Sequence, residues 1–509
     1  MKSIYLIISL LLPSIGFSYT ISDTTKKTVE KGEIFHSQQT LTINGKRISL
    51  KTETGTVQLR DENDEPIALF GFTYYQKQSK IDSKYEKDKP KRPIVFAFNG
   101  GPLSASFWLH MGILGPKRIE INDPGYTLPA PYKVVNNEYS ILEKADLVMI
   151  DPIGVGFSKP TGKAKWEDFW GVDQDIRSIG LFIDQFLART GNFNAPKYLL
   201  GESYGTFRNA GLVKYLQDKG IAMNGVIMVS AVFELQHLLF GPGDDLAYLI
   251  HFPTYAATAW YHKKIKGEPE NLENFLNEVR QFTETEYALA LLRGDRLSTD
   301  EKEAMAAKLA KYSGIDKNTW LKADLRITNR EYFQALLKEE QLTVGRLDSR
   351  FTGINEDPLA QNALTDPQSD AISPPYIAAF KNYLYQDLGV RPDLTYTTST
   401  GGRKDFKWDW KHKGNISWNA QTAVSTLPDL ASALKQNPNL KVLILNGYFD
   451  LATVFYGVEH SVNHLNLPDN LRENVIMKYY EAGHMMYTHP PSMKKFKEEV
   501  DQFIEQTQH

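Results

Sequence analysis

The pentapeptide Gly201-Glu202-Ser203-Tyr204-Gly205 constrains the fold of this chain more than any other stretch. An apolar run at 198–200 precedes it, and a helical-looking segment at 207–217 follows it. A strand that turns sharply into a helix forces the serine into a strained backbone conformation, which small neighbours permit, and lifts its hydroxyl above the sheet. A plain turn is the alternative for so short a pattern, but the flanking strand and helix favour a nucleophilic serine.

Short apolar runs alternate with helical patterns on both sides of this serine. The runs are 93–98, 145–150, 198–200 and 225–229, and isoleucines and a phenylalanine at helical spacing lie between the second and third. Such alternation predicts an α/β fold with a mostly parallel sheet covered on both faces. Upstream, the Asn44-Gly45 turn between strand-like runs predicts an antiparallel hairpin, and 67–75 predicts a further strand.

The chain is long for one compact domain, so we expect a core with an insertion among its 509 residues. The alternation stops near residue 232, and 240–390 is rich in helical patterns. Strand-like runs resume at 440–445 and 475–480, and an amphipathic helix ends the chain. We therefore predict a core at 19–231, a helical cap at 232–395 and the rest of the core at 396–509.

The N-terminus has the pattern of a secretory signal peptide. Lys2 precedes the apolar run 4–15, and small residues at Gly16 and Ser18 predict cleavage after residue 18. The run is short for a membrane span, and no later segment is apolar enough for one; a buried or anchoring N-terminal helix is the alternative. The chain has 0 cysteines, which suits a bacterial periplasmic or secreted protein better than a secreted eukaryotic enzyme.

The bulk charge argues against a nucleic-acid partner, because the net charge is −3 and no large basic block is present. The sequence leaves the oligomeric state open, a homodimer included.

Polar residues follow five of the predicted strands: Asn99-Gly100-Gly101, Asp151, Ser203, Asp450 and His484. The carboxyl ends of parallel strands meet at one edge of a sheet, where active groups gather. The order Ser203, Asp450, His484 is that of an α/β-hydrolase triad. Asp151 competes with Asp450 but precedes the serine, so we expect it to tie down a loop. His489 lies before two prolines and predicts a structural turn.

Each member of the predicted triad has a chemical task. A serine hydroxyl is a weak nucleophile until a base takes its proton, and His484 would do this and later protonate the leaving group. Asp450 would hold the imidazole in the required tautomer. The backbone N–H groups of Tyr204 and Gly101 are the predicted donors of the oxyanion hole.

These motifs resemble those of the serine carboxypeptidases. The chain has Asn99-Gly100-Gly101-Pro102, Gly201-Glu202-Ser203-Tyr204-Gly205, Gly447-Tyr448-Phe449-Asp450 and Ala482-Gly483-His484 in the family's order, and 151–158 resembles a further family segment. The resemblance is strong over 93–230 and 440–489. It implies a peptidase that removes C-terminal residues from peptides with a free C-terminus, without a metal or other cofactor.

The resemblance also implies that Asn99 and Glu202 bind the C-terminal carboxylate of the substrate. An anion can approach a glutamate only when a proton lies between them, so a buried Glu202 should have a raised pKa. We therefore expect faster peptide hydrolysis at mildly acidic pH than at neutral pH.

Two positions depart from the family pattern. Leu103 replaces a glycine of the mouth loop, and Ile113 replaces a second carboxylate-binding glutamate, which leaves Lys117 or Arg118 to take over that contact. These changes keep a serine esterase or acyltransferase open as an alternative. A catalytically silent peptide-binding protein is the alternative from another functional class, since fold alone does not separate the three.

Overall fold

The computed structural model describes residues 30–78, 91–241, 243–357, 360, 363, 365–413 and 423–508. The predicted signal peptide, 1–18, lies outside these residues.

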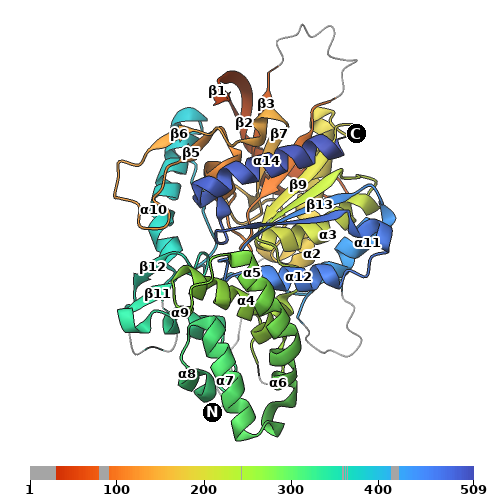
Figure 1. Cartoon of the computed structure of the whole chain (residues 1–509). Coiled ribbons are helices and arrows are strands. Elements are labelled where there is room, and N and C mark those ends of the chain that lie inside the picture. The colour runs from red at the N-terminus through yellow and green to blue at the C-terminus, as the bar shows by residue number, and fades with distance from the viewer. Residues whose placement is uncertain are drawn as a thin grey trace, which may run out of the picture.

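One large sheet organises the chain (Figure 1), in the order β1-β2-β3-β7-β4-β9-β10-β13-β14, with β8 paired to β3. β1, β2 and β3 are antiparallel, β3 is also antiparallel to β7, and every neighbour from β7 to β14 is parallel. The strands are β1 (Ile34–Ile43), β2 (Lys46–Arg60), β3 (Pro66–Lys77), β4 (Ile94–Phe98), β7 (Asp146–Asp151), β8 (Lys159–Pro160), β9 (Lys197–Glu202), β10 (Gly225–Val229), β13 (Lys441–Gly447) and β14 (Val475–Tyr480). Both the predicted hairpin and the predicted parallel sheet are confirmed.

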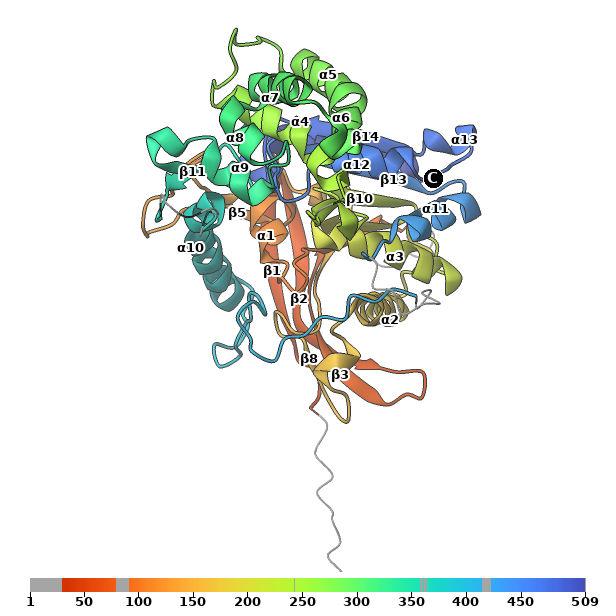
Figure 2. The ribbon, with the colours of Figure 1, turned by 90° about the horizontal axis from the view of Figure 1, so that it is seen from below.

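The central strands β4, β7, β9 and β10 are buried along their whole length. Helices cover both faces of a parallel sheet, which is why these strands read as continuous apolar runs in the sequence. Figure 2 shows α2, α3 and α11 together beside the sheet, with α10 near α1 on the opposite side. The core helices are α1 (Phe107–Leu109), α2 (Val172–Thr190), α3 (Tyr204–Asp218), α11 (Leu427–Gln436), α12 (Phe455–Asn463), α13 (Asp469–Arg472) and α14 (Pro490–Thr507).

The inserted block is mostly helical, and its part at 246–335 forms a lobe at one end of the sheet (Figure 1). Its elements are α4 (Leu246–Tyr261), α5 (Leu272–Phe282), α6 (Ala288–Arg293), α7 (Thr299–Ser313), α8 (Lys317–Lys322), α9 (Asn329–Ala335), α10 (Pro367–Asn382), β11 (Leu342–Val344) and β12 (Thr352–Ile354). Ser298 and Glu301 form the expected capping box of α7.

Apolar side chains divide this block into two parts. Those between 248 and 344 form a cluster of their own, together with a few side chains from 448–455. Those from Phe351 to Tyr396, including α10, join the main cluster around the sheet. The predicted cap, 232–395, therefore contributes to both clusters.

A mostly parallel sheet that is covered by helices on both faces and has antiparallel strands at one edge is the α/β-hydrolase fold.

None of the helices built from described residues has the length and apolar character that a bilayer span requires.

Gly447, the last residue of β13, lets two strand exits approach each other. A Cβ atom there would lie 2.3 Å from the carbonyl oxygen of Gly483 and 2.5 Å from that of Ala482. We expect Gly447→Ala to lower the free energy of unfolding by about 1–3 kcal/mol, as overpacking usually does, measured by chemical denaturation. Gly241→Ala is the control, because a Cβ there meets nothing within 4 Å. Equal effects of the two substitutions would contradict the prediction.

Candidate active site

Ser203 lies at the turn between β9 and α3 in a strained conformation. Its φ is 59° and its ψ is −129°, a left-handed backbone that a residue with a side chain rarely adopts. Its backbone N–H donates to the carbonyl oxygen of Val229 at the end of β10 over 3.0 Å. The geometry is that of the strand–turn–helix elbow expected from the sequence.

Asp450 and His484 lie side by side at the ends of β13 and β14. Nδ1 of His484 is 2.7 Å from Oδ2 of Asp450, and the two residues are 4% and 0% exposed respectively. Oδ1 of Asp450 accepts hydrogen bonds from the backbone N–H groups of Ala452 and Thr453, at 2.8 and 3.0 Å. These contacts fix the orientation of the carboxylate toward the imidazole.

The charge of Asp450 also acts on the proton affinity of His484. Burial alone would lower the pKa of this imidazole, but the hydrogen-bonded carboxylate outweighs burial and raises it above the ordinary value. His484 therefore gains basicity from Asp450, as a general base requires.

Ser230, directly after β10, connects the three strand exits. Its hydroxyl donates to the carbonyl oxygen of His484 over 2.6 Å, and its own carbonyl oxygen lies 3.0 Å from the hydroxyl of Thr453. The preceding residue, Val229, holds the backbone of Ser203. The structure thus brings the segments that carry Ser203, Asp450 and His484 to one end of β10.

The loop after β4 packs directly against the serine turn. A Cβ atom on Gly100 would lie 2.5 Å from the backbone nitrogen of Tyr204, so only glycine fits there. Gly101 follows with a φ of 113°, which also favours glycine. The two predicted oxyanion donors, Gly101 and Tyr204, thus belong to adjoining segments; their function as donors stays a prediction.

Glu202 lies at the centre of a buried polar network beside the serine. Asn99 donates from Nδ2 to Oε1 of Glu202 over 2.9 Å, and the Tyr487 hydroxyl donates to Oε2 over 2.6 Å. Glu202 is 4% exposed, and burial raises its pKa to about 7, although His484 and these hydrogen bonds act in the opposite direction. The raised pKa expected from the sequence is therefore present.

A buried ion pair holds the loop that carries Asn99. Nε of Arg208, on α3, is 2.6 Å from a carboxylate oxygen of Asp175 on α2, and both side chains are buried. Nη1 of Arg208 also donates to the carbonyl oxygen of Asn99 over 3.0 Å. The pair thus positions the asparagine that contacts Glu202.

A short cap segment, 346–349, joins the loops of Asp450 and His484. Two hydrogen bonds join it to the loop of Asp450, and two join it to the loop of His484. The hydrogen bonds run from Ser349 N to Phe449 O (2.9 Å), from Leu451 N to Arg346 O (3.1 Å), from His484 N to Leu347 O (2.6 Å) and from Gly483 N to Asp348 Oδ2 (3.0 Å). This segment therefore fixes the relative position of the two loops.

The competing residues have structural tasks in the described part of the chain. Asp151 accepts a hydrogen bond from the backbone of Ser106 over 2.8 Å and so ties down a loop, as expected. His489 precedes the first turn of α14, and its Nδ1 lies 2.8 Å from the hydroxyl of Ser492.

The two departures from the expected motif are buried. Leu103 is 1% exposed and has a positive φ of 60°, so its side chain points into the protein and not into the solvent. Ile113 is fully buried in a single π-helical turn, His110–Leu114.

Sequence reasoning missed several residues that support the site, among them Tyr487, Thr453, Ser230 and Asp348. Thr453 and Tyr487 each lie three residues after a predicted triad member, so local spacing is a signal that points to them. Asp348 has no such signal, because it lies 135 residues from Gly483, whose backbone N–H donates to it.

Comparison with known proteins identifies one family that matches this chain. A family model described as serine carboxypeptidase matches residues 44–497. A search of curated proteins found no match.

Similar solved structures include a proline iminopeptidase from Mycobacterium smegmatis, with 14% identity, a TM-score of 0.33, and coverage of 93% of this chain and 99% of that one. A Pyrococcus furiosus esterase has 8% identity and a TM-score of 0.35, covering 90% and 92%. A soluble variant of monoglyceride lipase from Saccharomyces cerevisiae has 12% identity and a TM-score of 0.35, covering 89% and 95%. At these scores the neighbours say nothing about substrate.

The buried Glu202 should make stability depend on pH. Its pKa rises from 4.5 in the unfolded chain to about 7 in the folded one, so its stabilising contribution is complete below pH 4.5 and is lost as the pH rises through 7. Relative to Glu202→Gln, the wild type should lose on the order of 3 kcal/mol of unfolding free energy from acidic to neutral pH, at about 1.4 kcal/mol per pKa unit. Chemical denaturation of both proteins across this range measures the difference, and a constant difference would refute the raised pKa.

Proposed function

Because this chain belongs to the serine carboxypeptidase family, we propose that it is a serine-type carboxypeptidase that acts through an acyl-enzyme on Ser203. The observation that carries the proposal is the buried pair of Glu202 and Asn99, directly beside the strained serine. A hydrolase that ignores the substrate's C-terminus has no need of a buried carboxyl group at this position.

The proposed reaction has two halves. His484 takes the proton of the Ser203 hydroxyl as the oxygen attacks the last peptide bond, and the N–H groups of Gly101 and Tyr204 stabilise the oxyanion. His484 then protonates the departing amino group, which leaves as a free amino acid. Water, activated by the same imidazole, hydrolyses the ester on Ser203 and regenerates the enzyme.

Recognition of the substrate carboxylate would depend on the protonation state of Glu202. With a pKa of about 7, this group is mostly protonated at mildly acidic pH and can donate a hydrogen bond to an anion. Above pH 7 it becomes charged and repels the anion. Protonation of Glu202 therefore favours mildly acidic pH, whereas His484, whose pKa is raised above its ordinary value, loses its function as a base as the pH falls.

The biological setting is also part of the proposal. The signal peptide predicted at 1–18 and the lack of cysteine in the sequence support export to a bacterial periplasm or to the outside of the cell. The substrates would be peptides with a free C-terminus, and the mechanism requires no cofactor.

Peptides with free and amidated C-termini test the proposal. We expect kcat/KM to fall by at least about a hundredfold on amidation, because a buried polar site discriminates strongly against a substrate that lacks its partner group. Ser203→Ala should lower kcat on the free peptide by about a millionfold. Equal activity on both peptides would instead indicate the alternative, a serine esterase or acyltransferase. Failure of an organophosphonate to label Ser203 would indicate a silent binding protein.

We propose that Arg118 replaces the missing glutamate at position 113. Its Nε is buried without a hydrogen-bond partner. Burial and the charge of Glu202 raise the pKa of Tyr376, whereas the charge of Arg118 lowers it, so both charges act on one hydroxyl. Arg118 and Glu202 therefore both lie near Tyr376, which supports Arg118 as a contact for the substrate carboxylate.

We expect Arg118→Met to raise KM for free peptides by about tenfold, which corresponds to one charged hydrogen bond of about 1.4 kcal/mol. Lys117→Met is the matched control and should change KM little. Steady-state kinetics on free and amidated peptides measures both variants, and an equal effect of Arg118→Met on the two substrates would rule out contact with the carboxylate.

A further inference from the structure

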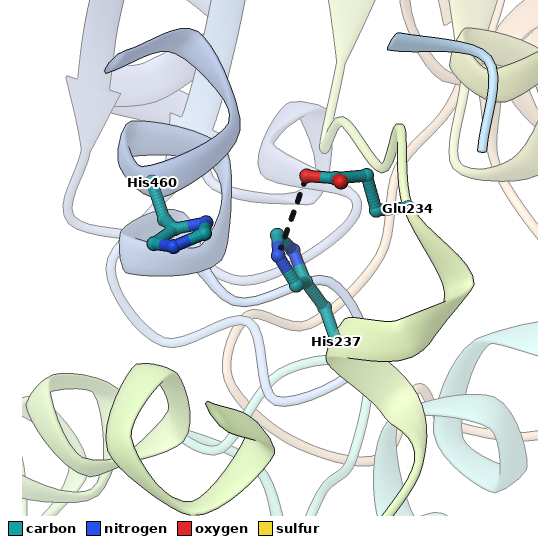
Figure 3. Close-up of side chains that lie close together, drawn as sticks. All are labelled: Glu234, His237 and His460. Carbon is teal, nitrogen blue, oxygen red and sulfur yellow. Dashed lines mark ion pairs between the residues drawn. The ribbon is translucent and has the colours of Figure 1, made fainter. Parts of the chain in front are cut away.

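A second group of ionisable side chains lies outside the proposed active site. Glu234 and His237 come from the segment that follows β10, with His237 in a short 3-10 helix, η5 (Leu235–Leu238), and His460 comes from α12. Figure 3 shows the three side chains pointing toward one another. We call them the His-Glu cluster. Within the described residues they form the group of three whose ligand atoms all lie within 4.8 Å of one another.

Two imidazole nitrogens of this cluster lack hydrogen-bond partners. His237 is only 5% exposed, and its Nε2 is buried without a partner; Nδ1 of His460 is buried in the same way. Burying a polar nitrogen without a partner costs roughly 1–3 kcal/mol. Buried polar atoms without a partner are rare in folded proteins, so two of them in adjacent rings indicate that a further binding partner belongs here.

One of these nitrogens faces the carboxylate of the third member. Nε2 of His237 lies 3.5 Å from Oε2 of Glu234, which is too long for a good hydrogen bond. This distance suits two ligands of one metal ion, since metal–ligand bonds of about 2.0–2.1 Å in a tetrahedral site place neighbouring ligand atoms roughly 3.4 Å apart.

We propose that the His-Glu cluster binds a divalent transition-metal cation of the zinc type. Two imidazoles and one carboxylate form a ligand set that Zn²⁺ accepts, with a fourth position left for water. The metal would satisfy the buried nitrogen of His237 and balance the charge of Glu234. The site takes no part in the chemistry proposed for Ser203.

The surroundings of the cluster are those of a supported metal site. The hydroxyl of Ser461 donates to Oε2 of Glu234 over 2.8 Å and so orients the carboxylate, as a second layer of contacts around a metal does. A cavity of about 10 Å³, lined by His237 and Ser461 among others, adjoins the cluster. It has room for a single ion or water molecule.

The position of the cluster implies a structural effect. Glu234 and His237 lie in the first residues of the predicted cap, whereas His460 lies on the helix that follows the Asp450 loop. Thr453 of that loop lines the same small cavity. A metal here would join the base of the cap to the helix beside Asp450, and it would stabilise the folded chain by binding only that state.

Titration of the untagged, metal-stripped full chain with Zn²⁺ tests the proposal. We expect one Zn²⁺ per chain by calorimetry, a rise in Tm of several degrees, and a visible absorption band when Co²⁺ is used instead. His460→Asn and Glu234→Gln should each weaken Zn²⁺ binding by at least about a hundredfold, because losing a ligand costs more than losing its second-layer partner. Circular dichroism identifies the variants that fold, and only these are compared.

Two control variants separate this site from other histidines. His464 is exposed and bonds to the backbone of His460 through Nδ1, but it is not a member of the cluster, so His464→Asn should keep the binding. His484→Ala should also keep it, because the proposed active site is separate. Absence of Zn²⁺ binding by the wild type, retention of binding in folded Glu234→Gln and His460→Asn, or loss in His484→Ala would overturn the proposal.

Discussion

The hydrogen bond between Asp450 and His484 is the contact around which the site is built. It forms because β13 and β14 are parallel neighbours in register, with Gly447 opposite Tyr480, so that their following loops leave the sheet at the same edge. Both residues are almost completely buried, so the interaction is stronger than it would be at the surface. The rest of the sheet brings the serine turn to the same edge.

The two acidic residues of the site, Asp450 and Glu202, have different hydrogen-bond partners. Asp450 accepts from backbone N–H groups and faces an imidazole, which suits a carboxylate. Glu202 is buried, with hydrogen bonds to the side chains of Asn99 and Tyr487, and burial raises its pKa to about 7, which suits a carboxylic acid at mildly acidic pH. Opposite environments for two acids are how one site combines a basic and an acidic function. A base at His484 and an acid at Glu202 are the two groups that the proposed carboxypeptidase reaction needs.

Local patterns predicted the features that depend on local physics. The apolar runs of β4, β7, β9 and β10 and the Asn44-Gly45 turn specified most of the sheet, and the pentapeptide around Ser203 specified the elbow. Contacts between distant segments left no such pattern, which is why Asp348 and the Arg208–Asp175 pair were missed. Nothing in the sequence shows that α12 and η5 meet, so it does not predict that His237 and His460 lie together.

The segment 346–349 has a consequence for how substrate reaches Ser203. It belongs to the inserted block, yet it holds the backbone of His484 and the loop of Asp450. In the proposed mechanism, movement of this segment away from the sheet would separate His484 from Asp450 and abolish activity. Substrate and product should therefore enter and leave while the segment 346–349 stays in place. Any conformational change that admits substrate should occur in parts of the lobe farther from this segment.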